Sequence, residues 1–229
     1  MTATPTRISV VVPTLNEREQ LPRLLQDLAA LRREGLELIL VDGGSSDATP
    51  AVAAGRVDRV IVTAPGRAAQ MNAGARAARG AILWFLHADS RVAPAALAML
   101  DRACADGHRW GRFDVRLSGR RWPFRIIERM MNLRSCVSGL ATGDQGIFVT
   151  RELFGAVGGY PDQPLMEDIA LSKTLRRHGA PCCIRHPRLV TSSRRWEMRG
   201  IWRTVWLMWR LRLAYALGAP PHRLARRYR

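Results

Sequence analysis

The chain has 229 residues, of which 47% are hydrophobic, and a formal net charge of +17. This length suits one sizeable domain with an appendage, and the hydrophobic fraction excludes wholesale disorder. The four cysteines, at 104, 136, 182 and 183, form no Cys-x-x-Cys pair, which argues against structural zinc and a disulfide framework and favours a reducing cytoplasm. Residues 2–7 are polar and lead straight into a strand pattern, so no secretory signal is expected.

The positive charge is concentrated in the second half of the chain. Residues 1–108 carry 12 Arg against 11 acidic residues, whereas residues 109–229 carry 24 basic against 8 acidic residues. The second half is therefore suited to meet anions, which are phosphates, lipid headgroups or nucleic acid. The charge comes without a zinc finger, a helix-turn-helix or an aromatic RNA-binding pattern, so no nucleic-acid partner is expected.

Strand and helix patterns alternate along most of the chain. Short apolar runs predict strands over 7–12, 36–41, 57–63, 81–86, 109–117 and 147–150. Helical spacing of apolar residues predicts helices over 18–33, 47–54, 67–79, from 94 onward, and over 124–133, 165–178 and 201–217. The alternation predicts an α/β fold with a mostly parallel central sheet flanked by helices.

In such sheets ligands bind beyond the carboxyl ends of the strands. Polar clusters follow three of the predicted strands, at Thr14-Leu15-Asn16-Glu17, at Asp42 to Asp47, and at His87-Ala88-Asp89. We therefore expect these clusters to share one edge of the sheet.

His87 and Asp89 follow a buried strand and project at its end. A carboxylate there suits Mg²⁺ or Mn²⁺, which completes its shell with phosphate oxygens and neutralises a diphosphate leaving group. The alternative is an ordinary turn-forming Asp.

Three further residues at this edge have two interpretations each. Asp42 accepts hydrogen bonds from a nucleobase or ribose, or it caps its own turn. Arg67 pairs with phosphate, or it is a solvated surface Arg. Asp47 is expected to cap the short helix over 47–54. Asn72 and Gly74, in the Ala-rich helix, are expected to serve close helix–sheet packing.

Carboxylates and Arg residues recur in the second half. Glu167 and Asp168 open a helix, where acidic residues are common for dipole reasons, and one of them is a candidate general base. Asp144 and Gln145 lie between two glycines, in a loop that binds an acceptor or simply turns. The run Arg194-Arg195-Trp196 clamps a diphosphate beside a stacking ring, or it is solvated Arg beside a core Trp.

Seven motifs occur in an order that resembles a known family. They are Pro13-Thr14-Leu15-Asn16-Glu17, Val41-Asp42-Gly43-Gly44-Ser45-Ser46-Asp47, Ala69-Gln70-Met71-Asn72-Ala73-Gly74, Phe85-Leu86-His87-Ala88-Asp89, Gly143-Asp144-Gln145-Gly146, Met166-Glu167-Asp168 and Arg194-Arg195-Trp196. From about residue 7 to 229 the chain resembles the inverting glycosyltransferases of family 2, which have the Rossmann-like GT-A fold. Within that family it is most similar to the bacterial subgroup called radical-SAM/selenodomain-associated transferase 2, also labelled arsenosugar-biosynthesis glycosyltransferase.

The resemblance implies a role for each matching position. The nucleotide would be held by Thr14, Asn16, Glu17, Asp42, Arg67 and His87. Asp89 would bind the metal, and Asp168, with Glu167 as its rival, would be the base. The diphosphate or acceptor would meet Asp144, Gln145, Arg194, Arg195 and Trp196. Two positions depart from the family pattern: His87 replaces the first Asp of Asp-x-Asp, and Ser192 replaces the Gln of Gln-x-x-Arg-Trp.

The resulting hypothesis is a metal-assisted inverting glycosyltransferase. It would move a sugar from a UDP- or GDP-linked donor to an unknown acceptor, either a lipid phosphate or a small molecule. Inversion needs one base and no protein nucleophile, which fits the single base candidate pair. The alternatives are a sugar-nucleotide-binding protein and a nucleotidyltransferase.

One domain is expected over residues 1–200, with a nucleotide-sugar half over about 1–108 and an acceptor half over about 109–200. Residues 201–229 are expected to form amphipathic, basic C-terminal helices. The segment 201–217 is too charged to span a membrane, and it places Trp202, Val205, Trp209 and Leu213 on one face. It lies at a membrane interface or packs on the domain. The expected location is cytoplasmic, with a peripheral contact at the inner face of the membrane.

Overall fold

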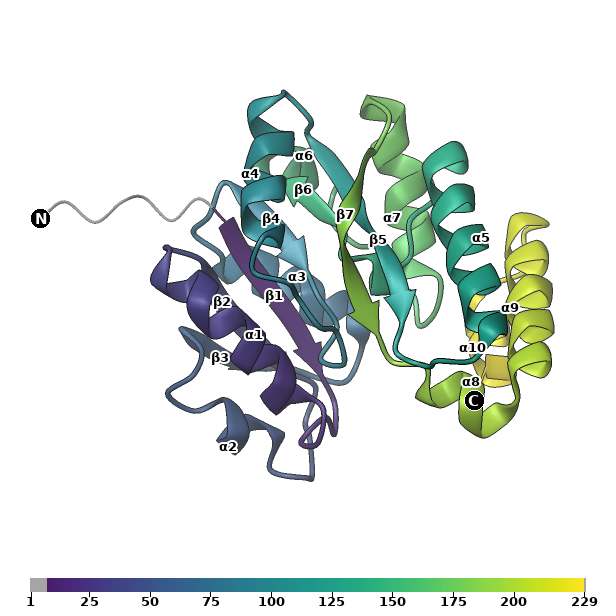
Figure 1. Ribbon diagram of the computed structural model, residues 1–229, viewed down its shortest axis with the longest axis horizontal. Helices are drawn as coiled ribbons and strands as arrows, with labels where there is room; N and C mark the ends of the chain where they lie inside the picture. The colour runs from purple at the N-terminus through teal and green to yellow at the C-terminus, as the bar shows by residue number, and fades with distance from the viewer. Residues whose placement is uncertain (1–7, 229) are drawn as a thin grey trace, which may run out of the picture.

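The computed structural model describes residues 8–228 and contains one seven-stranded sheet with helices on both faces (Figure 1). The strands, in chain order, are β1 Ile8–Thr14, β2 Glu37–Asp42, β3 Arg59–Val62, β4 Ile82–Phe85, β5 Trp110–Leu117, β6 Phe148–Thr150 and β7 Cys182–Thr191. Their order in the sheet is β3-β2-β1-β4-β6-β5-β7. The predicted polar segment 2–7 lies outside the described residues.

The sheet is mostly parallel, which confirms the predicted α/β class. Strands β3, β2, β1 and β4 run parallel, β6 is antiparallel to both of its neighbours, and β5 pairs in parallel with β7. The carboxyl ends of β1, β2 and β4 therefore meet at one edge of the sheet, as expected for the three polar clusters.

The helices before the acidic pair are close to the predicted ones, with two exceptions. They are α1 Leu21–Arg33, α2 Thr49–Ala53, α3 Arg67–Ala77, α4 Ala96–Ala105, α5 Trp122–Ser138, the single 3₁₀ turn η1 Gly143–Gln145 and α6 Arg151–Ala156. Helix α5 is longer than the predicted 124–133, and α6 was not predicted. Thr150 begins α6, because its side chain accepts the backbone N–H of Leu153.

The remaining helices are α7 Glu167–Leu175, the 3₁₀ turn η2 Arg176–His178, α8 Arg194–Arg199, α9 Ile201–Ala216 and α10 Pro221–Tyr228. Helix α7 with η2 occupies the predicted 165–178, and α9 occupies most of the predicted 201–217. Strand β7 and helix α8 were missed.

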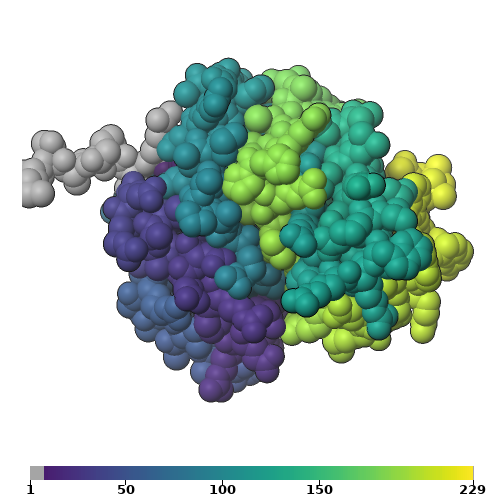
Figure 2. All heavy atoms as spheres, viewed as in Figure 1, coloured from purple at the N-terminus to yellow at the C-terminus, as the bar shows by residue number. Residues whose placement is uncertain are grey.

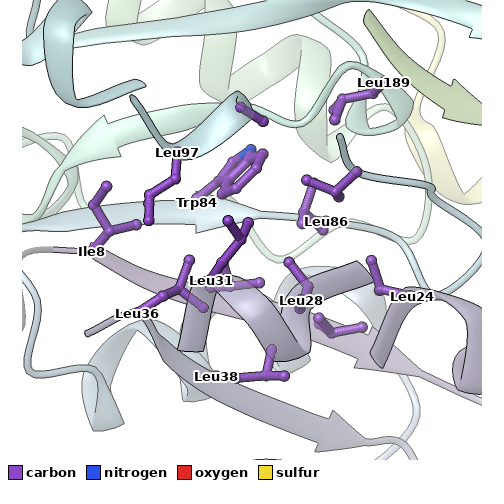
Figure 3. Packing of buried hydrophobic residues seen from close by; sticks show 14 of the residues in the cluster. Ile8, Leu24, Leu28, Leu31, Leu36, Leu38, Trp84, Leu86, Leu97 and Leu189 are labelled. Carbon is purple, nitrogen blue, oxygen red and sulfur yellow. The ribbon is translucent and has the colours of Figure 1, made fainter. Parts of the chain in front are cut away.

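Each central strand is buried on both faces, so its side chains alternate between two cores. Val10 and Val12 of β1 face α1 and α4, whereas Val11 faces α3. On the first face, leucines of α1 such as Leu28 and Leu31 lie beside Trp84 (Figure 3). This double burial explains why the strands are continuous apolar runs rather than alternating ones.

The C-terminal helices pack against the second half of the sheet domain. Leu211 of α9 and Leu224 of α10 are buried against Ile169 of α7. Phe124 of α5 belongs to a separate small cluster, on which Ile201 at the start of α9 packs. Figure 1 accordingly shows α5, α9 and α10 together at the end of the molecule opposite α2 and β3.

One expectation about the cysteines is wrong. Cys136, near the end of α5, forms a disulfide with Cys183 in β7, and their Cα atoms are 6.0 Å apart. The two positions are 47 residues apart in sequence, so only the packing of α5 beside β7 brings them together. The cysteine pattern therefore no longer supports a reducing compartment.

Candidate active site

Hydrogen bonds of buried polar side chains connect the carboxyl ends of β1 and β2. Thr14 Oγ1 donates to Asp42 Oδ1 at 3.2 Å, and the backbone N–H groups of Gly44 and Ser45 donate to Asp42 Oδ2 at 3.0 and 2.8 Å. Gln70 of α3 donates its amide to the Thr14 carbonyl at 2.7 Å. Asp42 thus caps its own turn, one of its two interpretations, and its contact with a nucleotide stays a prediction.

The loop after β1 is tied to the loop after β2. Asn16 has a left-handed backbone, with φ 57°, a conformation that Asn tolerates better than most residues. Its Oδ1 accepts the backbone N–H of Ser46 at 2.8 Å, and the N–H of Glu17 donates to Thr49 Oγ1 at 2.9 Å. Burial raises the pKa of Glu17, and the nearby Asp89 carboxylate raises it further.

Asp47 holds the same region. Its carboxylate accepts the backbone N–H groups of Arg18 and of Thr49, the first residue of α2. The prediction that Asp47 is the N-cap is nevertheless wrong, because Ala48 occupies the N-cap position of α2 and no side chain caps the helix there. A hollow of about 410 Å³ opens here, lined by Asn16, Glu17, Arg18, Glu19, Gln20, Asp47 and Arg194.

The turn after β4 carries Asp89, which lies near Ser192 at the end of β7. Burial raises the pKa of Asp89, while the Arg194 and Arg67 guanidinium groups act in the opposite direction. Asp89 also lines a second hollow, of about 370 Å³, on the side of the sheet where β5 and β7 end. It thus lies between the end of β4 and the basic second half.

His87 packs against η1 and is uncharged. A Cβ added to Gly143 would lie 2.5 Å from His87 Nε2, so only glycine allows this approach. Burial lowers the pKa of His87 to about 3, and the charges of Arg67 and Arg195 contribute. Its Nε2 atom is buried and has no hydrogen-bond partner among the described residues. A neutral imidazole can accept a hydrogen bond or bind a metal.

The side chains at this site could hold a metal ion only together with ligands from the substrate. Within residues 8–228, no three His, Cys, Asp or Glu side chains gather as a metal-binding group. Asp89 and the unpartnered nitrogen of His87 come from one turn. Mg²⁺ is commonly held by one or two carboxylates plus substrate phosphates, and these residues fit that arrangement.

The acidic pair at the start of α7 divides into two roles. Glu167 is buried, and its Oε1 lies 3.2 Å from Arg67 Nη1. Burial raises the pKa of Glu167, and the adjacent Asp168 raises it further. Asp168 Oδ2 instead accepts the backbone N–H of Gly143 at 2.8 Å. Arg67, for which phosphate pairing and solvation were the two interpretations, pairs with a carboxylate and stays half exposed.

Turn η1 carries two polar residues, Asp144 and Gln145. Gln145 is fully buried, and its amide donates to Ser135 Oγ at 2.8 Å while its Oε1 accepts the N–H of Thr142. Asp144 Oδ1 is buried without a hydrogen-bond partner among the described residues. Burial raises the pKa of Asp144, and the negative charge of Asp168 adds to the rise.

Helix α8 brings Arg194 and Arg195 to the same edge. The charge of Arg194 acts on Glu17 and Asp89, which places it at the junction of the two halves. Arg195 lies 4.4 Å above the Tyr228 ring. Trp196 is half-buried on the small cluster that contains Phe124, so its environment is the core one of its two interpretations.

Three supporting residues had no predicted role at the site or a wrong one. Gln70 bridges two strand ends, and its only sequence signal is a polar side chain within an Ala-rich helix. Asn72 exchanges two hydrogen bonds with the Tyr160 backbone, at 2.8 and 2.9 Å, so it holds the loop before α7 rather than packing on the sheet. Arg134 of α5 is half-buried, which lowers its pKa to about 10, and its charge interacts with those of Asp144 and Asp168.

Comparison with known proteins agrees with this geometry. The family model described as glycosyl transferase family 2 matches residues 9–148, more than half of the chain. A PGL/p-HBAD biosynthesis glycosyltransferase of Mycobacterium bovis is 32% identical over 165 residues, which cover 66% of this chain and 62% of that protein. An undecaprenyl-phosphate 4-deoxy-4-formamido-L-arabinose transferase of Pseudomonas paraeruginosa is 33% identical over 156 residues, 61% of this chain and 44% of that protein. The chain thus spans less than two thirds of these relatives.

Solved structures share the fold at low sequence identity. Staphylococcus aureus TarS (residues 1–349), in complex with UDP, has a TM-score of 0.67 at 17% identity, over 81% of this chain and 60% of that one. The mannosyltransferase PcManGT of Pyrobaculum calidifontis, in complex with GDP-Man and Mn²⁺, has a TM-score of 0.61 at 22% identity, over 83% of this chain and 57% of that one. The chain therefore belongs to glycosyltransferase family 2 and has the GT-A fold.

Proposed function

We propose that the protein transfers a sugar, with inversion, from a UDP- or GDP-linked donor to an acceptor hydroxyl or phosphate. The observation that carries the proposal is that Asp89, at the end of β4, and Asp168, in α7, both lie within electrostatic reach of Asp144 in η1. A metal–diphosphate site and a general base are the two components that an inverting transfer requires.

The donor is proposed to bind over about residues 1–108. The ends of β1 and β2 and the loop after β1 contribute Thr14, Asn16, Glu17 and Asp42. Arg67 lies at the same edge, at the start of α3. The hollow beside Asn16 and Glu17 gives a nucleotide room. TarS with UDP and PcManGT with GDP-Man support a nucleotide-sugar donor but do not distinguish the base.

Mg²⁺ or Mn²⁺ is proposed to bind between Asp89 and the donor diphosphate. The metal would neutralise the charge that develops on the leaving group. His87, uncharged and with a free ring nitrogen, would contact the nucleotide or the ion. Burial raises the pKa values of Glu17, Asp89 and Asp144, and a bound cation would stabilise the charged form of carboxylates in such a place.

Asp168 is proposed as the general base. Its bond to the Gly143 N–H holds the carboxylate beside η1 and the end of β4. Glu167 is the rival, but its pairing with Arg67 suits a positioning residue better. A base carboxylate in such a site contributes about 10²- to 10⁴-fold to the rate.

The acceptor is proposed to bind over about residues 109–200, near Asp144, Arg194 and Arg195, with Gln145 and Trp196 supporting η1 and α8. Residues 201–229 are the proposed C-terminal appendage. One relative is named for an undecaprenyl-phosphate substrate, which supports a lipid-phosphate acceptor and a peripheral membrane contact through 201–217 at the inner, cytoplasmic face. We also propose membership of the radical-SAM/selenodomain-associated subgroup on the ordered motifs.

A thermal-shift panel of UDP- and GDP-sugars with Mn²⁺ tests the donor site. We expect one donor to raise the melting temperature, and Asp89→Ala to abolish the metal-dependent part of that rise. Absence of a shift with every nucleotide sugar would refute the donor proposal. The second candidate is a sugar-nucleotide-binding protein, which is favoured by the presence of only one carboxylate, Asp89, beside His87. Release of UDP or GDP in the presence of candidate acceptors distinguishes a transferase from such a protein.

A further inference from the structure

Helix α5 exposes a continuous apolar stripe along its whole length. Every third or fourth residue is large, apolar and 44–80% exposed: Trp122, Ile126, Met130, Leu133 and Val137. On its opposite side, Phe124 and Ile127 are buried in the small cluster. The helix is therefore apolar on two faces, of which the domain covers only one.

Helix α9 carries a second stripe with the same spacing. Its members, of which the last directly follows the helix, are 60–79% exposed: Trp202, Trp206, Trp209, Leu213 and Leu217. The sequence pattern placed Val205 on this face, but Val205 is half-buried and packs on the cluster that Phe124 anchors. The stripe is thus shifted from the predicted one, and it contains three exposed indole rings.

The two helices are neighbours, so the stripes belong to one end of the molecule. Ile201 and Val205 of α9 share a cluster with Phe124 and Ile127 of α5. Figure 1 shows α5 and α9 side by side, and Figure 2 shows that side chains of the α5 segment and the C-terminal segment form that end of the surface. We call the ten exposed side chains of α5 and α9 the two-helix face.

Basic residues surround the two-helix face. Residues 120–138 and 194–228 together contain 14 Arg and only two acidic residues, Glu128 and Glu197. Arg129 lies beside the α5 stripe, and Arg203 and Arg210 lie beside the α9 stripe and are exposed. Arg210 stacks 4.4 Å above the Trp206 ring. The combination of indole rings, aliphatic side chains and Arg is typical of segments that lie in a membrane interface.

We infer that the two-helix face docks on an anionic bilayer, with both α5 and α9 inserted among the headgroups. Charge complementarity between anionic headgroups and the Arg residues around the two-helix face favours a bilayer. A second copy of the chain would bring two Arg-rich faces together, and their like charges oppose association, whereas anionic headgroups neutralise them. Among residues 8–228 no helix is long and apolar enough to cross a bilayer, so the contact is peripheral.

The inference deepens the proposed function, because the face adjoins the acceptor half. Arg134 of α5 and Arg212 of α9 act on each other and on Asp144 of η1. An acceptor held in the bilayer would thus enter the site from the two-helix face. The reason for membrane binding rests on the proposed function, because it assumes a lipid acceptor. The binding itself does not, because it is measured without a donor and without turnover.

Vesicle flotation of the full chain tests the inference. We compare vesicles of phosphatidylcholine alone with vesicles that contain phosphatidylglycerol. The wild type should float with the anionic vesicles, and this binding should fall with added salt. Two triple variants, Trp122→Ser/Leu133→Ser/Val137→Ser and Trp202→Ser/Trp206→Ser/Trp209→Ser, should each weaken binding by about tenfold or more, since each removes three of the ten inserted apolar side chains.

Val60→Ser/Val62→Ser is the matched control. Both side chains are exposed apolar residues of β3, on the opposite end of the molecule, so binding should be unchanged. Circular dichroism checks that each variant is folded. Bound wild type with unchanged binding by the α5 variant would overturn the two-helix face. The inference would also be overturned if the wild type did not bind vesicles but formed a dimer that either triple variant converts to a monomer. The occupant of the two-helix face would then be a second copy of the chain. Loss of turnover with retained flotation would affect only the proposed function.

Discussion

Asp168 and Glu167 are adjacent in sequence but meet different partners. Asp168 accepts the Gly143 N–H, whereas Glu167 is buried against Arg67. The sequence motif identifies the pair, but the partners come from α3 and η1, which are far away in the chain. The choice between the two carboxylates therefore depends on tertiary contacts that no local pattern reveals.

We predict that Asp168→Asn keeps the donor-induced thermal shift and lowers turnover by about 10²- to 10⁴-fold, the contribution of a general base. Glu167→Gln is the paired variant, and it should change donor affinity more than the chemical step, because it releases Arg67. Release of UDP or GDP under saturating donor measures the first effect, and donor titration measures the second. The reverse outcome would make Glu167 the base.

Asp144 is a buried carboxylate whose Oδ1 has no hydrogen-bond partner in the described chain. Burial raises its pKa above the usual 3.8, so the folded protein binds this proton more tightly than the unfolded chain does. Its contribution to stability is therefore full below pH 3.8 and is lost as the pH rises through the raised pKa.

We predict that Asp144→Asn melts at a higher temperature than the wild type at neutral pH. The difference should shrink as the pH is lowered and the wild-type carboxyl becomes protonated. A gain of about 1 kcal/mol would correspond to roughly 2–4 °C in a protein of this size. Thermal melts across the pH range measure the gain, and a difference that does not vary with pH would refute the assignment to this carboxyl.

At the scale of elements, the central strands could be predicted because burial on both faces makes them continuous apolar runs. Strand β7 could not, because it lies at the sheet edge and its middle reads Arg185-His186-Pro187-Arg188. Proline and charged residues are tolerated at an edge, where one row of backbone groups needs no partner. Helix α8 was missed because its Arg residues point away from any core.

Gly74 is the position where α3 lies closest to the sheet, as predicted. A Cβ there would come 2.3 Å from Val11 Cγ1, so Gly74→Ala must push α3 away from β1. We predict a loss of about 1–3 kcal/mol of folding free energy, measured by urea unfolding. Gly155→Ala in α6 is the control, since no atom lies within 4 Å of its added Cβ. Equal stability of the two variants would contradict the close packing.

At the scale of the whole molecule, the sequence predicts the class of sheet and the edge where the polar clusters meet. It does not predict the strand order of the second half, in which β6 lies between β4 and β5. Nor does it predict that α5 and α9 pack side by side and leave ten large apolar side chains uncovered. These features depend on contacts between segments far apart in the chain, and helical periodicity describes only one segment at a time.

The Cys136–Cys183 disulfide is the other long-range contact of the second half, and it joins α5 to the sheet. A cross-link that closes a loop of 47 residues restricts the unfolded chain and stabilises by about 4 kcal/mol in the loop-closure model. We predict that protein purified without reductant shows two titratable thiols when denatured, and that dithiothreitol lowers its melting temperature. Cys136→Ala should remove the sensitivity to dithiothreitol, whereas Cys182→Ala, at the neighbouring position, should keep it. Four thiols in the denatured wild type would show that the bridge does not form, and the cysteines would again favour a reducing compartment.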